Sequence, residues 1–143
     1  MSIKTIRQIL GDRPLHHVTP ETTLGAAARV MAENGVGAVV VMDGAGLAGI
    51  LSERDIVFRG VAREIPMADT AVREIMTREP THVGIDDAIS DALAAKLGDS
   101  FRHLPVMEGA AVVGLLSYRD IPAEYVMLFE RFREMSTARA DDG

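Results

Sequence analysis

The sequence contains one short polar run twice, because Ser52-Glu53-Arg54-Asp55 recurs as Ser117-Tyr118-Arg119-Asp120. A serine followed three residues later by an acid is typical of a capping box, in which the hydroxyl and the carboxylate each accept a backbone N–H at a helix start. The arginine of each run stands in the first helical turn, where the helix dipole favours an acid. A bound anion such as a phosphate would explain that arginine. The run therefore has two interpretations, helix capping and anion binding.

This polar run belongs to a longer internal repeat. Residues 17–56 align with residues 82–121 without a gap. Upstream the register slips by one residue, so that residues 6–10 match residues 72–76. A unit of about fifty residues that occurs twice predicts two copies of one structural unit around a shared core.

Local signals predict the order β-α-β-β-α within each unit. In the first unit, Thr22 or Thr23 can cap a helix that Asn34-Gly35 ends. Two apolar, β-branched runs around a glycine-rich turn then predict a pair of strands. The predicted strands cover residues 36–42, 47–51, 104–107 and 112–116, and further helices are predicted to start at Ser52, Asp86 and Ser117. The predicted fold class is α+β.

The composition excludes several classes of protein. The chain has 143 residues and a formal net charge of −6. It contains no cysteine, which excludes disulfides, thiolate nucleophiles and sulfur-ligated metal sites and favours a reducing compartment. The acidic balance disfavours nucleic acid and anionic membranes as general partners. No apolar run reaches the length of a membrane-spanning helix, and we expect a cytoplasmic protein.

Two other patterns could carry chemistry. Residues 44–49 match G-x-G-x-x-G, and Asp69 lies where a dinucleotide fingerprint would place an acid. The second unit has Ala111 in place of Gly46, which is the glycine that a pyrophosphate requires. A hairpin turn is therefore favoured, and a nicotinamide-dependent oxidoreductase is the least favoured function. His16 and His17 would point to opposite faces of a strand, so no metal site is predicted.

The repeat resembles the CBS domain, a family named after cystathionine β-synthase whose members occur in pairs called Bateman modules. The resemblance rests on the order β-α-β-β-α, on the Ser-x-Arg-Asp-Ile end of each unit and on Arg102-His103-Leu104-Pro105-Val106. Residues 75–81 are similar to the linker that opens a second repeat. The resemblance covers residues 5–121, extends to small stand-alone CBS pairs of bacteria, and implies two repeats related by a pseudo-two-fold axis.

The resemblance implies a regulatory sensor and not an enzyme. Its ligand would be an adenine nucleotide, namely AMP, ADP, ATP or NAD(H), bound in the cleft between the repeats; S-adenosylmethionine is a further candidate. Binding would be signalled through conformation or dimer geometry to an unknown downstream protein. The alternative is an interaction or adaptor protein whose clefts stay empty.

The resemblance also implies site residues, because in CBS pairs the Ser-x-x-Asp of one repeat faces the opening linker and first core strand of the other. The aspartate would accept hydrogen bonds from the ribose hydroxyls. The primary cleft is predicted to contain Thr5, Leu10, Val36, Gly37, Ala38, Arg102, His103, Ser117, Arg119 and Asp120. The secondary cleft is predicted to contain Ser52, Arg54, Asp55, Ala71 and Met76. It ranks second because it has Ala71 in place of Thr5 and lacks the Arg-His pair.

A C-terminal helix is predicted to be amphipathic and to carry three of the six aromatic residues. Its apolar stripe comprises Tyr125, Leu128, Phe129 and Phe132, and we expect this stripe to form a homodimer interface. The chain is expected to divide into a first repeat with its linker segment (residues 1–60), a connection (61–71), a second repeat with the C-terminal helix (72–135) and a polar tail (136–143).

Overall fold

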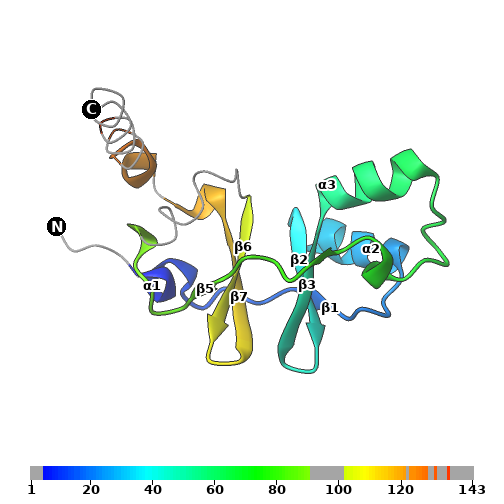
Figure 1. Cartoon of the computed structure of the whole chain (residues 1–143), viewed down its shortest axis with the longest axis horizontal. Helices are drawn as coiled ribbons and strands as arrows, with labels where there is room; N and C mark the ends of the chain where they lie inside the picture. Colours follow the sequence, from blue (N-terminus) through cyan, green and yellow to red (C-terminus); the bar gives the residue numbers. More distant parts are fainter. Residues whose placement is uncertain (1–4, 91–101, 122, 129–130, 132–134, 136–143) are drawn as a thin grey trace, which may run out of the picture.

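The computed structural model describes residues 5–90, 102–121, 123–128, 131 and 135. Two antiparallel hairpins stand side by side at its centre (Figure 1): β2 (Ala38–Asp43) with β3 (Gly46–Ser52), and β6 (His103–Glu108) with β7 (Ala111–Ser117). Both hairpins have an irregularity at the equivalent place, Val41/Met42 and Val106/Met107. The N–H of Val112 donates to the carbonyl of Ala45 and joins the two hairpins. The predicted α+β fold with two repeats is confirmed.

The first repeat follows the predicted order of elements. The strand β1 (His17–Val18) lies parallel to β2, and α2 (Leu24–Asn34) connects them. Thr23 caps α2, and Gly35 ends it in the left-handed conformation at φ 63. After β3 the chain enters α3 (Glu53–Asp55), which continues as a π-helical turn, η1 (Ile56–Gly60), and a 3-10 turn, η2 (Val61–Arg63).

The second repeat differs from the prediction at its helices. The strand β5 (Val83–Gly84) lies parallel to β6, but the following helix begins at Ile89 and not at Asp86. Residues 86 and 87 form a turn instead, in which the Asp87 carboxylate accepts the N–H of Gly84 at 2.8 Å. After β7 the chain makes only a 3-10 turn, η4 (Tyr118–Asp120), before a helix over residues 123–128. The prediction of a helix starting directly at Ser117 is therefore wrong.

The segment that precedes each repeat in the chain packs into the core of the other repeat. The helix α1 (Ile6–Leu10) packs into the buried cluster of the second repeat, where its N-terminal residues bond the backbone of residues 85 and 87. The equivalent turn η3 (Val72–Glu74) packs into the first repeat. Matching ion pairs fasten the two segments, Arg7 with Asp86 and Arg73 with Glu21.

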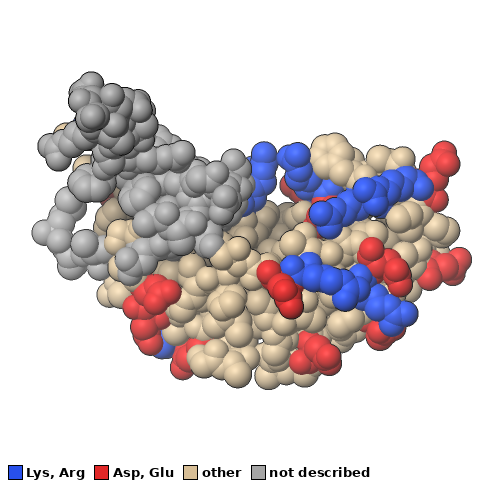
Figure 2. Space-filling model, in the orientation of Figure 1, with Lys and Arg blue, Asp and Glu red and all other residues tan. Residues whose placement is uncertain are grey.

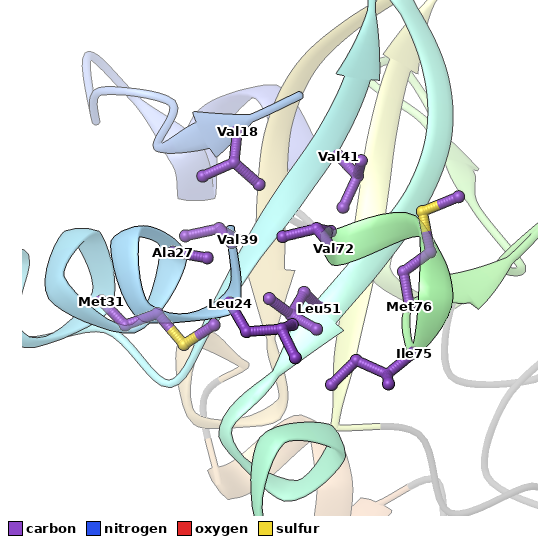
Figure 3. Close-up of a cluster of buried hydrophobic side chains, with 10 residues drawn as sticks. All are labelled: Val18, Leu24, Ala27, Met31, Val39, Val41, Leu51, Val72, Ile75 and Met76. Carbon is purple, nitrogen blue, oxygen red and sulfur yellow. The ribbon is translucent and has the colours of Figure 1, made fainter. Parts of the chain in front are cut away.

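The core of the first repeat is made of aliphatic side chains from five elements and the linker (Figure 3). Leu24, Val39, Leu51 and Val72 are fully buried at its centre. Ile75 and Met76 of the linker close one side of this cluster. The strand β4 (Thr77–Arg78) then adds to β3 as a fourth strand that was not predicted. In the described residues, no helix combines the length and apolar character needed to cross a membrane.

The glycine-rich run forms the turn and second strand of a hairpin. Gly44 takes the left-handed conformation at φ 65 in the turn, and β3 begins at Gly46. Gly49 lies so close to the linker that a Cβ there would be 2.6 Å from the Thr77 carbonyl oxygen. A dinucleotide fingerprint needs a helix to start inside the motif, and the strand found there excludes that interpretation.

Candidate functional site

The first Ser-x-Arg-Asp run forms the predicted capping box. The Ser52 N–H donates to Asp55 Oδ2 at 3.0 Å, and the Asp55 N–H donates to the Ser52 hydroxyl at 3.1 Å. The Asp55 side chain is 13% exposed, and its Oδ1 lies 3.9 Å from Arg59 Nε, beyond hydrogen-bond distance. Capping thus uses one carboxylate oxygen and leaves the other available.

The second run uses its aspartate in the same way but adds an ion pair. The Ser117 N–H donates to Asp120 Oδ2 at 2.7 Å, and the Ser117 hydroxyl accepts the N–H of Arg119 at 3.3 Å. Arg13, from the N-terminal segment, approaches the same Oδ2 at 2.8 Å. The Asp120 side chain is 16% exposed, so this pair is shielded from water on the aspartate side.

Charged groups from both repeats act electrostatically on His103, which is half-buried at the start of β6 and pairs with Ser117 of β7. Burial lowers the pKa of His103, and the positive charges of Arg102 and Arg119 lower it further. The negative charges of Glu53 and Asp120 act in the opposite direction on the same pKa. Because Glu53 belongs to the first repeat, this group of charges spans the junction between the repeats.

Of the first-repeat residues predicted for the primary cleft, Gly37 contacts Glu53. The Glu53 N–H donates to the Gly37 carbonyl at 2.9 Å, and a Cβ on Gly37 would stand 3.2 Å from the Glu53 carboxylate. Ala38 is buried and pairs with Ser52, whereas Val36 is partly buried against the core of the first repeat. Gly37 thus lies next to Glu53, whose negative charge raises the pKa of His103.

The two predicted residues of the N-terminal segment have structural roles. Thr5 caps α1 by a reciprocal pair of hydrogen bonds with Gln8 and bridges Ala88. Leu10 is buried against β7, where a Cβ on Gly114 would lie 2.7 Å from its Cδ1. Leu10 therefore lies on the same repeat as Asp120.

Two residues predicted for the secondary cleft, Ala71 and Met76, make contacts equivalent to those of Thr5 and Leu10. Ala71 bridges Thr23, and Met76 packs against Gly49. Arg54 lies over the ring of Phe58, with 4.8 Å between its guanidinium carbon and the ring centroid. This cation–π contact gives Arg54 an intramolecular partner, so its position in the first helical turn does not require a bound anion.

Basic side chains gather on one edge of the molecule. Figure 2 shows arginine side chains along the upper edge, over the part of the chain where β3 ends and α3 begins, and further arginines lower on the same face. This is the edge to which both Ser-x-Arg-Asp runs belong in Figure 1. Among the described residues, no group of three or more His, Cys, Asp or Glu could hold a metal ion.

The predicted dimer stripe separates into a buried and an exposed part. Tyr125 packs against the core of the second repeat, whereas Leu128 is 67% exposed. Phe129 and Phe132 lie outside the described residues. The exposed apolar side chains Val57, Phe58 and Val61 form a second set after the first Ser-x-Arg-Asp run.

Sequence reasoning missed Glu53 and Arg13 as residues of the site. Glu53 is the variable position of Ser-x-Arg-Asp, and its counterpart in the second repeat is Tyr118. Arg13 corresponds to Glu79 when the upstream segments are aligned with the one-residue slip. A reversal of charge between two copies of a repeat was a signal that could have identified Arg13.

Comparisons with known proteins match both repeats. The family model of the CBS domain matches residues 6–61 and 72–124. The CBS domain-containing protein CBSCBSPB5 of Arabidopsis thaliana is 36% identical over 124 residues, which are 86% of this chain but only 23% of that protein. The chain therefore spans about a quarter of this relative's length.

Solved structures agree with the family model. The crystal structure of the CBS domain NE2398 has a TM-score of 0.78 at 32% identity, covering 87% of this chain and 99% of that one. The CBS domain protein PAE2072 of Pyrobaculum aerophilum, complexed with AMP, has a TM-score of 0.78 at 27% identity and covers 89% and 97% respectively. With two matched repeats and these relatives, the chain belongs to the CBS-domain family.

Proposed function

We propose that this chain is a regulatory module that binds an adenine nucleotide, AMP, ADP, ATP or NAD(H), at the junction of its two repeats. One observation carries the proposal. Asp55 and Asp120 are both largely buried, and in each the Oδ1 is left over after Oδ2 has accepted the capping N–H. A free carboxylate oxygen in a shielded place can accept ribose hydroxyls.

The phosphate end of the ligand would meet the charges around His103. Arg102 and Arg119 act electrostatically on His103, and guanidinium groups bind phosphate through charge-assisted hydrogen bonds. The relative PAE2072 was crystallised with AMP, which supports the choice of AMP as the first ligand to test. Binding would favour one arrangement of the repeats, and a downstream protein would respond to that arrangement.

A second candidate function is an adaptor that binds no nucleotide. The capping hydrogen bonds of Ser52 and Asp55 and the contact of Arg54 with Phe58 give these residues structural roles without a ligand. This alternative predicts that substitutions at Asp55 and Asp120 alter stability alone.

Self-association would transmit the signal. The large hydrophobic side chains that are more than half exposed in the described residues all follow one of the two Ser-x-Arg-Asp runs: Val57, Phe58, Val61, Met127, Leu128 and Met135. Two similar apolar sets on one molecule suit a second copy of the chain, since a symmetric dimer requires a self-complementary surface. We expect a homodimer in which Leu128 is buried.

Titration calorimetry with AMP tests the function. The chain is compared with Asp55→Asn and Asp120→Asn, because asparagine keeps an oxygen that can accept the capping N–H but removes the charge that strengthens a ribose contact. We expect wild type to bind AMP and each substitution to weaken its own site about tenfold or more.

Thermal unfolding of the same variants provides the control. A small change in melting temperature together with lost AMP binding supports a ligand role for the carboxylate. If wild type shows no AMP, ATP or NADH binding and no rise in melting temperature at millimolar nucleotide, the chain is the adaptor and the proposed function is wrong.

A further inference from the structure

The carboxylates of the two sites differ in how many hydrogen bonds they can still accept. A carboxylate oxygen has two lone pairs. Asp120 Oδ2 accepts the Ser117 N–H at 2.7 Å and also forms an ion pair with Arg13 Nη1 at 2.8 Å, so a further donor at this oxygen would have to compete with Arg13. Asp55 Oδ2 accepts the Ser52 N–H at 3.0 Å, and in the described residues it has no second donor. Asp55 therefore has an open Oδ1 and an Oδ2 that accepts only the capping N–H among the described residues, whereas at Asp120 only Oδ1 is open.

This difference follows from a charge reversal between the repeats. Arg13 ends the segment that packs α1 into the second repeat. Its counterpart before the second repeat is Glu79, which is acidic and cannot pair with a carboxylate. Asp55 instead has Arg59 from its own helical segment, at 3.9 Å from Oδ1. Within the part of the chain that the structure describes, Asp120 but not Asp55 has a close guanidinium from another segment.

The hydroxyls of a ribose are vicinal, and a carboxylate that binds both places one at each oxygen. At Asp120 the second hydroxyl must therefore displace either the capping N–H of Ser117 or Arg13. The N–H is fixed by the backbone after β7, whereas Arg13 is a long side chain that is 44% exposed. Arg13 is the group that moves.

A guanidinium that leaves a carboxylate needs another anion. A nucleoside brings none, but a nucleotide brings a phosphate into the same group of charges, where Arg102 and Arg119 already act on His103. Arg13 can then pair with phosphate oxygens in the bidentate geometry that guanidinium favours. The cost of opening the pair is offset for the nucleotide alone.

We propose that Arg13 is a specificity-determining residue, which makes the site at Asp120 select a nucleotide over a nucleoside because the phosphate replaces Asp120 as its partner. This inference rests on the proposed function, since it assumes that Asp120 binds the ribose. It goes further by assigning a role to a residue of the N-terminal segment. It also makes the two sites unequal, because Asp55 accepts a ribose without such an exchange.

The test measures AMP and adenosine binding by calorimetry on the full chain carrying Asp55→Asn, so that the heat comes from the site at Asp120. Adding Arg13→Gln removes the competing cation. Adenosine affinity should rise about fivefold, the size expected for loss of a partly exposed ion pair, while AMP affinity stays level or falls. The preference for AMP over adenosine should therefore shrink about fivefold or more.

Two further variants make the result specific. Arg7→Gln removes the other two ion pairs of the same segment, with Asp86 at 3.0 Å and with Glu108 at 3.4 Å, and should leave the preference unchanged. Arg13→Lys keeps the positive charge but loses the bidentate donor, and it should keep most of the preference. Circular dichroism before each titration verifies that the variant is folded.

Several outcomes would overturn the inference while the proposed function stands. In one, wild type binds AMP but Arg13→Gln leaves the ratio of the two affinities unchanged. In another, Asp55→Asn alone abolishes binding of both ligands, so that the site at Asp120 takes neither. If wild type itself binds no nucleotide, the proposed function fails and the inference fails with it.

Discussion

A carboxylate that caps a turn can still bind a ligand, since its two oxygens accept hydrogen bonds independently. Asp55 and Asp120 satisfy their capping bonds through Oδ2, so helix capping and ligand binding do not exclude one another. The sequence could predict the capping pair, because capping depends on residues three apart. It could not predict Arg13, which reaches Asp120 from more than a hundred residues away and depends on how the N-terminal segment packs.

His103 makes stability depend on pH. Burial lowers the pKa of its imidazole in the folded chain, among the charges of Glu53, Asp120, Arg102 and Arg119. In the unfolded chain the pKa returns to its ordinary value of about 6.5. Below that pH the unfolded state therefore binds more protons than the folded state, and stability falls as pH falls. We expect the melting temperature to drop more between pH 7 and pH 5 in wild type than in His103→Gln.

The comparison with His103→Gln isolates this histidine, because all other titrating groups are shared by the two proteins. Parallel pH profiles would show that His103 keeps its ordinary pKa. Bound AMP should reduce the difference, since a phosphate nearby favours the charged imidazole.

Equivalent glycines in β3 and β7 test how tightly each linker segment packs on its strand. An alanine Cβ at Gly49 would meet the Thr77 backbone oxygen at 2.6 Å and Met76 Sδ at 2.9 Å, whereas at Gly114 it would meet only the end of the Leu10 side chain, at 2.7 Å. A backbone oxygen in β4 cannot move aside, but a leucine can change rotamer. We expect Gly49→Ala to lower the free energy of unfolding by about 2–3 kcal/mol and Gly114→Ala by about 1 kcal/mol.

Urea unfolding of the two variants measures this difference, with each acting as the control for the other. Equal losses of stability would contradict it, because they would mean that the contact of β3 with β4 is no more rigid than that of β7 with α1. The presence of β4 beside β3 is the structural reason for the expected inequality.

At the scale of helices and strands, the sequence predicts those elements that are determined by their own residue types. The cap at Thr23, the stop at Gly35 and both central hairpins follow from local residue types. The short strand β4 and the late start of the second repeat's helix have no such signals, because they depend on pairing with β3 and on the turn around Asp87. The exposure of Val57 and Val61 could not be predicted from the sequence either. Helical periodicity shows which residues share a face of a helix but not which other element covers that face.

The whole molecule is held together by segments that cross between the repeats. Ile6 and Leu10 complete the core of the second repeat, and Val72 and Met76 complete that of the first. Neither core is therefore built from one continuous unit of the alignment. A change at the N-terminal segment therefore acts on the second repeat. Conversely, a ligand bound at Asp120 would alter the position of Arg13 and its neighbours in that segment.

The apolar surfaces that follow the two Ser-x-Arg-Asp runs give a prediction for the assembly. Phe58 is 55% exposed and Leu128 is 67% exposed, and in Figure 1 their segments lie on the same upper side of the molecule. Burying such side chains against a second copy is favourable by about 1.5–3 kcal/mol each. Placing a charge in that interface without a partner costs more than this gain. We expect wild type to be dimeric in light scattering after size-exclusion chromatography, and both Phe58→Glu and Leu128→Glu to shift it towards monomer.

Substitution elsewhere on the surface separates an interface effect from a general change in solubility. Glu108 is exposed, ends β6 and forms an ion pair with Arg7; it belongs to neither apolar set, and Glu108→Gln should leave the dimer intact. A monomeric wild type would contradict the predicted assembly. So would a dimer that persists in both glutamate variants, because the second copy would then be bound by some other surface. If only Leu128→Glu dissociates the dimer, the helix over residues 123–128 forms the interface, and Phe58 instead serves to hold Arg54 at 4.8 Å beside the site.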